Sequence, residues 1–537
     1  MKISHIRISN YSRIEDVDIE VRDHLILVGP NDVGKSSVLR ALNFALGLSG
    51  AQLYAQVGLD DIRDLAQPLV VEVELAGLDA SFGALFPDEL MTDLATGEVT
   101  LQVSIDVSAD QDAETVLIRR TCAKGRHGRQ MSREQLLAIG WKFLTATQSS
   151  LRDIREDRDA SLQDILSTIQ LGTEQEAFDS INAALQTQLT ASAVLDALKQ
   201  QLATQLSKAL PKEIQKDELE FVSAASATKD TFADVHLQLT RAGVAKGLSE
   251  QSDGARALFA MALYDLVSAS AHIVAIDEPE VHLHPASQRS LARLLFNGAN
   301  QKILATHSSD IVGVAEPEWI VSVREGGHLR QPNSGFLSNE EKLLASWWVK
   351  DKLEPLTARH LVAVEGASDR IFLQRAAELL GTDFDRHGVS LLEMGGSGIS
   401  YIIKLFGGAG FDVPLSVLID EDYKAASAKA FGVAEGDLEA MGVYTCVKDL
   451  EAEYVAAVGA PKLHKWLADS KLFSTNEFAN CRPTGASGEH TEVDVAKFCG
   501  TSKYKTRSAI AVVANIELSD VQKMAPIVNL ISNVNAT

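Results

Sequence analysis

The stretch from Leu25 to Ser37, which reads LILVGPNDVGKSS, constrains the fold of this chain more strongly than any other. An apolar run, Leu25 to Val28, precedes the pattern G-x-x-x-x-G-K-S, and the apolar residues that follow recur at helical spacing. This order predicts a short buried strand, a loop that binds phosphate and a helix that opens at Ser36. The stretch therefore predicts an α/β domain that binds a nucleotide.

Each residue that this loop pattern specifies has a chemical role. Gly29 and Gly34 let backbone N–H groups curl round a phosphate. Lys35 can reach the β and γ oxygens, and the hydroxyl group of Ser36 can hold Mg²⁺. The loop residues that we expect to bind ATP are Gly29, Asn31, Gly34, Lys35, Ser36 and Ser37.

Length and charge restrict the kind of protein. A chain of 537 residues is too long for one ordinary core, so two to four domains are expected. The formal net charge of −23 argues against a protein that coats nucleic acid with its whole surface. A DNA site would have to be a local basic patch. The arginine- and lysine-rich run at 119–133 is either such a phosphate contact or a solvated loop.

The cysteines and the apolar segments indicate a cytoplasmic protein. The four cysteines are scattered and form no C-x-x-C pair, so the sequence predicts neither a disulfide framework nor a zinc site. The amino terminus has no apolar signal-peptide region. Residues 255–276 contain charged side chains, so we interpret them as a buried helix and a strand, and we expect no membrane span.

The pattern changes at about residue 149. Between 149 and 212 glycine almost vanishes and apolar residues fall at helical spacing, as from Leu195 to Leu210. Two or three amphipathic helices are expected to interrupt the nucleotide domain. Their apolar stripes could pack on each other, or they could form an arm through which two chains associate.

Two later motifs suit the same nucleotide. The run His272 to Glu278 (HIVAIDE) reads as an apolar strand that ends in two acids, the Walker B pattern. Asp277 would hold Mg²⁺ through water, and Glu278 would orient or deprotonate the attacking water. A second apolar strand, Lys302 to Ala305, leads to His307, which could touch a γ-phosphate. Each motif alone would be weak evidence.

In the order P-loop, SDG, IDEPE and ATH, these motifs resemble the heads of ABC-type ATPases of the SMC-like branch, over residues 1 to about 325. The resemblance implies that Ser252 and Gly254 belong to the signature that closes over the nucleotide of a second copy. The working unit would then be at least a dimer. This signature is not LSGGQ, and Leu248-Ser249 is the alternative position for it.

A second group of acids follows two strands in the last third of the chain. Glu365 comes where the apolar run His360 to Val364 ends, and Asp369 lies one helical turn further on. The run LSVLIDEDY ends in Asp420 and Asp422, which would share one side of an extended segment. Carboxylates at the carboxyl ends of parallel strands meet at one edge of the sheet. Four acids with no nearby Cys or His suit Mg²⁺ or Mn²⁺, whereas either pair alone would more often be solvated.

The pattern V-E-G-x-x-D followed by a strand ending in D-x-D resembles a TOPRIM domain over residues 355 to 537. An ABC-type head with an inserted helical arm followed by TOPRIM is the arrangement of the overcoming-lysogenization-defect (OLD) family of nucleases, which includes the nuclease subunit of Gabija phage-defence systems. That resemblance implies a further acid and a lysine, for which Glu451 and Lys505 are the best matches. Lys503 competes with Lys505, and a surface lysine is the alternative for both.

The expected fold class is α/β, with an ABC-type head, an inserted all-helical arm and a TOPRIM domain built on a parallel sheet. The expected segments are 1–148 and 213–335 for the two parts of the head, 149–212 for the dimerisation arm, 336–356 for a linker and 357–537 for TOPRIM.

The resemblance implies a metal-dependent DNA endonuclease that is regulated by an ATP-binding head and acts in bacterial defence against phage. Glu365, Asp369, Asp420, Asp422 and Glu451 would hold the metal, and Lys505 would neutralise charge on the cleaved phosphate. We also expect a homo-oligomer, dimer or tetramer, and a helicase or other defence partner encoded nearby. The alternatives are a repair ATPase with a TOPRIM domain that does not cut, and an effector that cuts cellular RNA or tRNA.

Overall fold

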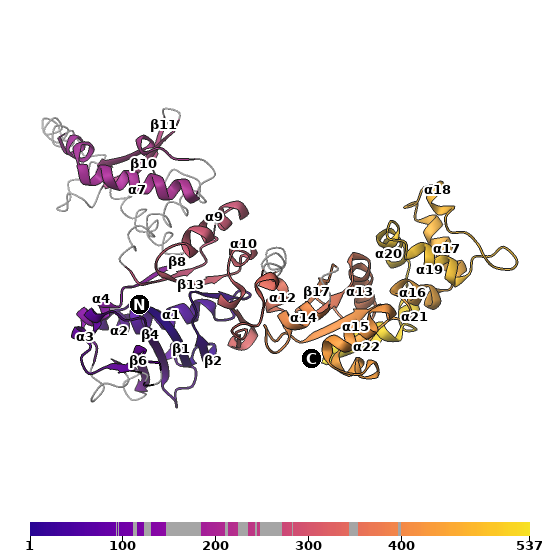
Figure 1. Cartoon of the computed structure of the whole chain (residues 1–537), viewed down its shortest axis with the longest axis horizontal. Helices are drawn as coiled ribbons and strands as arrows, with labels where there is room; N and C mark the ends of the chain where they lie inside the picture. The colour runs from indigo at the N-terminus through magenta and orange to yellow at the C-terminus, as the bar shows by residue number, and fades with distance from the viewer. Residues whose placement is uncertain are drawn as a thin grey trace. The chain divides into compact units, whose positions relative to one another are not determined.

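The computed structural model describes the chain (Figure 1) except for residues 93, 95, 111–114, 123–129, 146–183, 210–212, 224–234, 242–243, 248–270, 282, 343–352, 396–398 and 537. Much of the expected helical arm, the expected signature with Ser252 and Gly254, and part of the expected linker therefore lie outside the described residues. The chain divides into two compact units, one made chiefly of Met1–Leu329 and one of Arg330–Ala345 with Lys352–Thr537.

The first unit begins with an antiparallel sheet of six strands. Their order is β2-β1-β4-β6-β5, and β7 also pairs with β6. Ile6 and Ile8 of the first strand are fully buried, as the apolar–polar alternation of the sequence predicts, and Ile3 is buried across a shift in register between Ile3 and His5. The strands are β1 (Lys2–Tyr11), β2 (Ile14–Glu20), β4 (Leu69–Ala76), β5 (Leu90–Thr92), β6 (Val99–Asp110) and β7 (Thr115–Cys122).

The second sheet of this unit has the order β15-β14-β3-β13-β12-β8, and the pairs from β14 to β8 are parallel. Nearly all residues of its four central strands are buried, and most are apolar, because both faces of the sheet are covered. All carboxyl ends of these parallel strands lie at one edge. The strands are β3 (Leu25–Val28), β8 (Trp141–Thr145), β12 (Ile273–Asp277), β13 (Gln301–Thr306), β14 (Ile320–Val323) and β15 (Leu329–Arg330).

Helix α1 (Lys35–Leu46) lies between the two sheets and contacts strands of both. Its buried residues, among them Leu39, Leu42 and Phe44, join the two sheets in one apolar core. Helix α9 (Pro285–Phe296) covers the other face of the parallel sheet, where Leu291 and Leu295 pack on β12 and β13. The other helices here are α2 (Gly50–Gln56), α3 (Ala80–Leu85), α4 (Arg133–Ala138) and α10 (Ser309–Val312).

A small antiparallel sheet of β9 (Leu219–Ser223), β10 (Val235–Arg241) and β11 (Val244–Gly247) pairs with no other sheet among the described strands. Helix α7 (Ala193–Ala209) packs against β9. This helix is the described part of the expected arm. Among the described residues, these three strands join neither of the two larger sheets of the first unit.

The second unit is built on a parallel sheet of order β17-β16-β18-β19. Its strands are β16 (His360–Val364), β17 (Val389–Glu393), β18 (Leu415–Ile419) and β19 (Val443–Thr445). The helices are α12 (Glu354–Thr357), α13 (Ala367–Leu379), α14 (Ile399–Phe406), α15 (Lys424–Phe431), α16 (Leu450–Val458), α17 (Ala460–Asp469), α18 (Thr475–Phe478), α19 (Glu492–Cys499), α20 (Lys505–Val513), α21 (Leu518–Val521) and α22 (Ala525–Ala536). A core that runs from Val362 to Val534 joins them.

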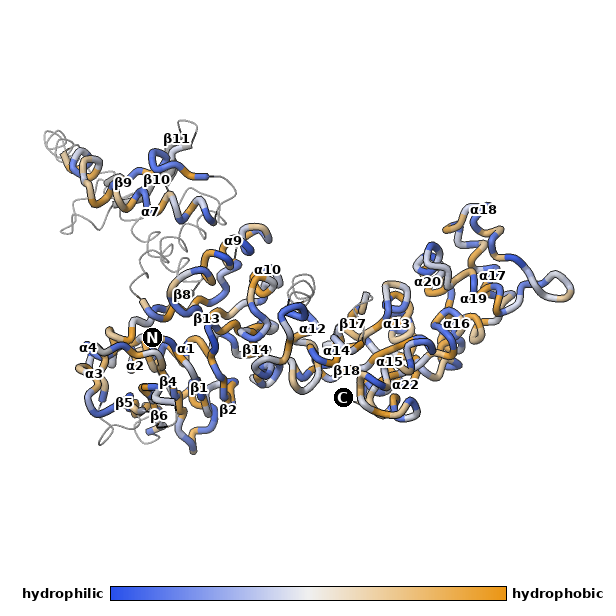
Figure 2. Tube along the Cα trace, in the orientation of Figure 1, coloured by the Kyte–Doolittle hydropathy of each residue, from blue (hydrophilic) through white to orange (hydrophobic). Residues whose placement is uncertain are grey.

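The described part of the expected linker packs on this second unit. Glu341 forms a salt bridge of 2.5 Å with Lys404 of α14, and its carbonyl oxygen accepts a hydrogen bond from Tyr401. Most helices carry both hydrophobic and hydrophilic residues (Figure 2), as expected for helices that bury one face. Among the described residues, no helix is long and apolar enough to cross a membrane.

Candidate functional site

The first candidate site lies at the carboxyl edge of the parallel sheet in the first unit, where β3 leads through the loop at 29–34 into α1. Gly34 has φ +112°, a left-handed conformation that glycine adopts easily. A Cβ atom on Gly29 would lie 2.2 Å from the carbonyl oxygen of Val323, so the close packing of the loop requires glycine there. The expected strand, loop and helix are thereby confirmed, with the helix starting at Lys35.

Lys35 lies at the mouth of this loop and is 4% exposed. Its Nζ atom donates to the carbonyl oxygens of Gly29 at 2.9 Å and Pro30 at 2.6 Å. Burial lowers the pKa of Lys35, although nearby acids, Glu278 and Asp277 first, oppose this shift. A phosphate bound in the loop would therefore give the ammonium group of Lys35 a charged partner in place of two neutral carbonyl oxygens. Asn31 is exposed and Ser37 half-buried on the same segment.

Ser36 and Asp277, the two expected ligands of Mg²⁺ in this site, are in contact. The hydroxyl group of Ser36 donates to Oδ1 of Asp277 at 3.0 Å. Burial raises the pKa of Asp277 above its usual range, and the hydrogen bond from Ser36 opposes that shift. A hydroxyl and a carboxylate oxygen this close form a hard oxygen site that suits Mg²⁺.

Glu278 and His307 follow the ends of β12 and β13. Glu278 has φ +50°, which is uncommon for a residue with a side chain and is frequent at functional sites. Nδ1 of His307 lies 4.0 Å from Oε1 of Glu278. The structure thus brings together the P-loop, the Walker B acids and the histidine, which the sequence separates by more than 200 positions.

Glu280 belongs to this site, although the sequence analysis did not select it. Its Oε1 atom accepts a hydrogen bond of 2.7 Å from the backbone N–H of His307 and lies 3.1 Å from Nδ1 of the same residue. The side chain is 4% exposed, and its Oε2 atom has no hydrogen-bond partner among the described residues. The signal was present, because Glu280 is the last acid of the IDEPE motif.

The basic run at 119–133 is only partly described. Arg120 donates to the carbonyl oxygens of Phe44 and Leu48, and burial lowers its pKa. This arginine closes the end of α1 and is not a surface contact for a phosphate. Arg119 is exposed, whereas 123–129 lie outside the described residues.

The second candidate site is a cluster of acids in the second unit, contributed by four different elements. Glu365 follows β16, and Asp369 lies in the first turn of α13. Asp420 follows β18, and Glu451 is the second residue of α16. The strands are parallel, so these positions meet at one edge of the sheet as expected.

Lys505, the first residue of α20, lies among these acids. Its Nζ atom is 3.7 Å from Oε2 of Glu451 and 4.0 Å from Oδ2 of Asp420. Burial acts to lower the pKa of Lys505, but the nearby carboxylates outweigh it and raise the pKa. A lysine at a helix amino terminus is unfavourable for the helix dipole, so the acids hold it there.

Several carboxylate oxygens of this cluster are buried without a hydrogen-bond donor. They are Oε2 of Glu365, Oδ1 of Asp369 and both side-chain oxygens of Glu451, and none has a hydrogen-bond partner among the described residues. Asp369 and Glu451 are 4% and 1% exposed. Buried acceptors without donors are costly, so this arrangement favours binding of a cation.

Three carboxyl groups of the cluster, those of Asp369, Asp420 and Glu451, have raised pKa values because they are buried close together. Burial raises the pKa of Glu451 to about 7, and Asp369 and Asp449 add to this effect. Burial also raises the pKa values of Asp369 and Asp420, and the neighbouring carboxylates raise them further. Lys505 opposes each shift but is one cation among four acids.

Asp449 is a second residue that the sequence analysis missed. It caps α16, because its Oδ1 atom accepts a hydrogen bond of 2.7 Å from the N–H of Ala452. A Cβ atom on Gly500 would lie 3.9 Å from Oε2 of Glu451 and 4.0 Å from Oδ2 of Asp449. The free oxygen of the cap therefore faces the same space as Glu451. The sequence KDLEAEY contained this signal, because Asp is a preferred helix cap.

The geometry expected for Asp422 is wrong. Strand β18 ends at Ile419, and Glu421–Tyr423 form a 3₁₀ turn, so the alternation of an extended segment does not apply to Asp420 and Asp422. The side chain of Asp422 is exposed. Its role as a ligand stays a prediction without the geometric support that the sequence suggested.

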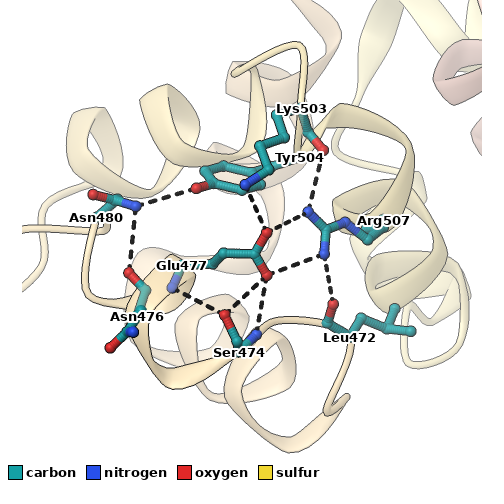
Figure 3. A network of polar contacts seen from close by, with 8 residues as sticks. All are labelled: Leu472, Ser474, Asn476, Glu477, Asn480, Lys503, Tyr504 and Arg507. Carbon is teal, nitrogen blue, oxygen red and sulfur yellow. Dashed lines mark hydrogen bonds and ion pairs between the residues drawn. The ribbon is translucent and has the colours of Figure 1, made fainter.

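Lys503, the alternative to Lys505, forms an ion pair with an acid outside the cluster. Its Nζ atom lies 3.0 Å from Oε1 of Glu477, which also pairs with Arg507 at 3.1 Å (Figure 3). Of the two lysines, the structure therefore places Lys505 beside the acids.

The donors of the acid cluster suit a hard divalent cation. They are carboxylate oxygens, and four of them are buried without a hydrogen-bond partner among the described residues. Such a set favours Mg²⁺ or Mn²⁺ over softer metals. The chemistry of these donors fits the expected metal, although no three of the acids bring ligand atoms within 4.8 Å of one another among the described residues.

Two family models match the chain. Residues 25–313 match the family described as "AAA domain, putative AbiEii toxin, Type IV TA system". Residues 356–422 match "Overcoming lysogenization defect protein-like, TOPRIM domain". The first match includes the P-loop, the Walker B acids and His307, and the second includes Glu365, Asp369 and Asp420.

Relatives of similar length also match. The chain is 21% identical over 479 residues to "Endonuclease GajA" of Bacillus cereus, covering 84% of this chain and 80% of the relative. It is 21% identical over 449 residues to "OLD nuclease" of Thermus scotoductus, covering 78% and 82%. Among solved structures, the C-terminal region of the Burkholderia pseudomallei OLD protein matches 33% of this chain and 98% of that chain, at 20% identity and a TM-score of 0.29.

The expected fold class is thereby confirmed. The first family model covers an ATPase domain over the first unit, and the second covers a TOPRIM domain on the parallel sheet of the second unit.

Proposed function

The chain belongs to the OLD family, in which an ATPase head precedes a TOPRIM domain, and on that premise we propose that it is a divalent-cation-dependent DNA endonuclease regulated by ATP. The observation that carries the proposal is the convergence of Glu365, Asp369, Asp420 and Glu451 around Lys505. A purely structural cluster would be expected to satisfy its buried oxygens, and this one leaves several without donors.

The residues of the cluster divide the work of phosphodiester hydrolysis. The carboxylates of Glu365, Asp369, Asp420 and Glu451 would hold one or two cations, with Asp422 as a further candidate. Bound Mg²⁺ or Mn²⁺ would supply Lewis-acid chemistry at the attacking and leaving oxygens. Lys505 would bind a nonbridging phosphate oxygen and stabilise the charge that develops on it.

The head would bind ATP through the P-loop. Lys35 would contact the β- and γ-phosphates, and Ser36 with Asp277 would hold Mg²⁺. Glu278 would orient or deprotonate the attacking water, while Glu280 fixes His307 near the γ-phosphate. The contact of Ser36 with Asp277 supports this assignment.

The proposal also covers how copies of the chain assemble and what the protein does in the cell. Ser252 and Gly254 of a second copy would complete each nucleotide site, so the protein would act as a dimer or tetramer through its heads and its arm at 149–212. The proposed domain boundaries are 1–148 and 213–335 for the two parts of the head, 336–356 for the linker and 357–537 for the nuclease domain. The names of the relatives, an endonuclease and a nuclease, support the cutting activity. We further propose that the protein acts on DNA in the cytoplasm as part of phage defence, with a helicase or other partner encoded nearby.

Cleavage of supercoiled plasmid tests the nuclease assignment. The wild-type chain with Mg²⁺ or Mn²⁺ should nick or linearise the plasmid, and Glu365→Gln should not. Glu421→Gln is the matched control, because Glu421 is an exposed acid on the turn after β18. Equal cutting by wild type and Glu365→Gln, or no cutting by wild type, would contradict the proposal. Preferential cleavage of RNA or tRNA in parallel reactions would overturn DNA as the substrate.

A further inference from the structure

A second group of potential metal ligands lies in the second unit, on elements that carry none of the four central acids. His464 belongs to α17, Cys481 follows α18, and His490 precedes α19. One ligand atom from each residue lies within 4.8 Å of the other two. The Sγ atom of Cys481 is 3.7 Å from Nδ1 of His490, and the rings of His464 and His490 stack with centroids 3.9 Å apart.

The chemistry of these side chains differs from that of the acid cluster. One thiol and two imidazoles form a soft and borderline donor set, which zinc prefers over magnesium. A tetrahedral zinc ion with ordinary bond lengths sets the S–N separation at about 3.6 Å and the N–N separation at about 3.3 Å. The measured 3.7 Å between Cys481 and His490 is close to that value, so small movements of the side chains complete the site.

The loop that carries two of the ligands is held in place by its own hydrogen bonds. Oδ2 of Asp494 accepts from the backbone N–H groups of Thr484 and Thr491, both at 2.9 Å, and Oδ1 accepts from the hydroxyl group of Thr484 at 2.7 Å. Cys481 is 4% exposed, and the ring of Phe478 lies 4.7 Å from that of His464. The loop is therefore ordered before any ion binds, and the ligands have partly apolar surroundings.

We infer that His464, Cys481 and His490 bind a zinc(II) ion, with a fourth position left for water. The sequence analysis predicted no zinc site from the scattered cysteines. The three ligands come from separate segments, so only the folded chain brings them together. The inference goes beyond the proposed nuclease function and does not depend on it.

The site has a structural consequence for its neighbours. A bound ion would join α17 to the segments on either side of the loop at 481–490. Asn480, next to Cys481, donates to the hydroxyl group of Tyr504 at 3.1 Å (Figure 3), and Tyr504 precedes Lys505. The ion would therefore brace the segment that leads into α20.

Cobalt(II) binding to the full chain tests this inference, because cobalt replaces zinc and reports its ligands by colour. Chelator-treated wild type should bind Co²⁺ with a thiolate-to-metal charge-transfer band that one equivalent of Zn²⁺ abolishes. Cys481→Ser should lose this band. Cys122→Ser, a buried cysteine of the other unit, is the matched control and should keep it. Glu365→Gln should also keep the band, which separates this site from the acid cluster.

His490→Gln provides a second variant in case Cys481→Ser fails to fold, since His490 is partly exposed. It should weaken Zn²⁺ binding at least tenfold and remove the rise in melting temperature that Zn²⁺ gives the wild type. A wild type without the charge-transfer band, or a band that survives in Cys481→Ser, would overturn the inference. These three residues would then form a hydrogen-bonded thiol–imidazole group only.

Discussion

Nζ of Lys505 lies 3.7 Å from Oε2 of Glu451, although the two residues begin different helices more than fifty positions apart. Glu451 is 1% exposed, and its oxygens accept no hydrogen bond from a described residue. Lys505 thus supplies positive charge to a buried acid that has no other donor. The same relationship would place an ammonium group beside a phosphate bound to the acid cluster.

Replacement of this lysine should remove cutting more strongly than it affects metal binding. Lys505→Met keeps the length of the side chain but deletes the charge, so we expect the single-turnover rate of plasmid cleavage to fall about 100-fold or more. Lys503→Met is the control, because Lys503 pairs with Glu477 and should leave the rate within about twofold. Equal losses in both variants would show that Lys505 has no special role.

The stability of the metal-free protein should fall as the pH rises. Burial raises the pKa of Glu451 from 4.5 to about 7 in the folded state, so the folded chain binds more protons than the unfolded chain between these values. The stabilisation is complete below pH 4.5 and is lost as the pH passes 7. The shift corresponds to at most about 4 kcal/mol, at about 1.4 kcal/mol per pKa unit.

Glu451→Gln should flatten this dependence, because glutamine does not titrate. Denaturant unfolding of both proteins in EDTA from pH 5 to pH 8 measures it. A variant with the same slope as the wild type would rule out Glu451 as its source.

Binding of the cation should release protons. The carboxyl groups of Asp369, Asp420 and Glu451 have raised pKa values in the metal-free state, and a cation requires them ionised. We expect the affinity for Mn²⁺ to be at least tenfold weaker at pH 6 than at pH 8. Titration calorimetry in two buffers of different ionisation enthalpy should show net proton release. An affinity independent of pH would contradict the raised values.

Two substitutions in the nucleotide site should affect ATP binding and ATP hydrolysis differently. Lys35→Ala should abolish ATP binding and leave Mn²⁺ binding at the acid cluster unchanged. Glu280→Ala should leave the Kd for ATP within about threefold but lower kcat for hydrolysis about tenfold or more, because it frees His307. Filter binding and phosphate release measure the two effects. A Glu280→Ala variant that loses ATP binding as fully as Lys35→Ala would contradict this division.

Local signals predicted most of the elements around both sites. The apolar runs before Gly29, Asp277, Glu365 and Asp420 are buried strands, as expected, because strands of parallel sheets are apolar on both faces. The loop pattern and the Walker B acids placed the nucleotide site by residue type alone. These features depend on short-range sequence, which a single chain displays directly.

Features that depend on side-chain packing could not be predicted. The sequence could not show that the chain turns at Glu421, which removes the alternation expected for Asp422, nor that Lys503 pairs with Glu477 and leaves Lys505 to the acids. Glu280 and Asp449 had local signals, but the contact of Glu280 with His307 and the position of Asp449 beside Gly500 depend on segments distant in sequence. The group of His464, Cys481 and His490 had no local signal, since a helix and two loop positions distant in sequence bring it together.

The most direct test of the central claim is anomalous diffraction from crystals of the full chain soaked in Mn²⁺. An anomalous peak within coordination distance of oxygens from Glu365, Asp369, Asp420 and Glu451 is predicted, together with its loss in Glu365→Gln. Manganese at the P-loop with nothing bound among these four carboxylates would contradict the claim that they form the cutting centre.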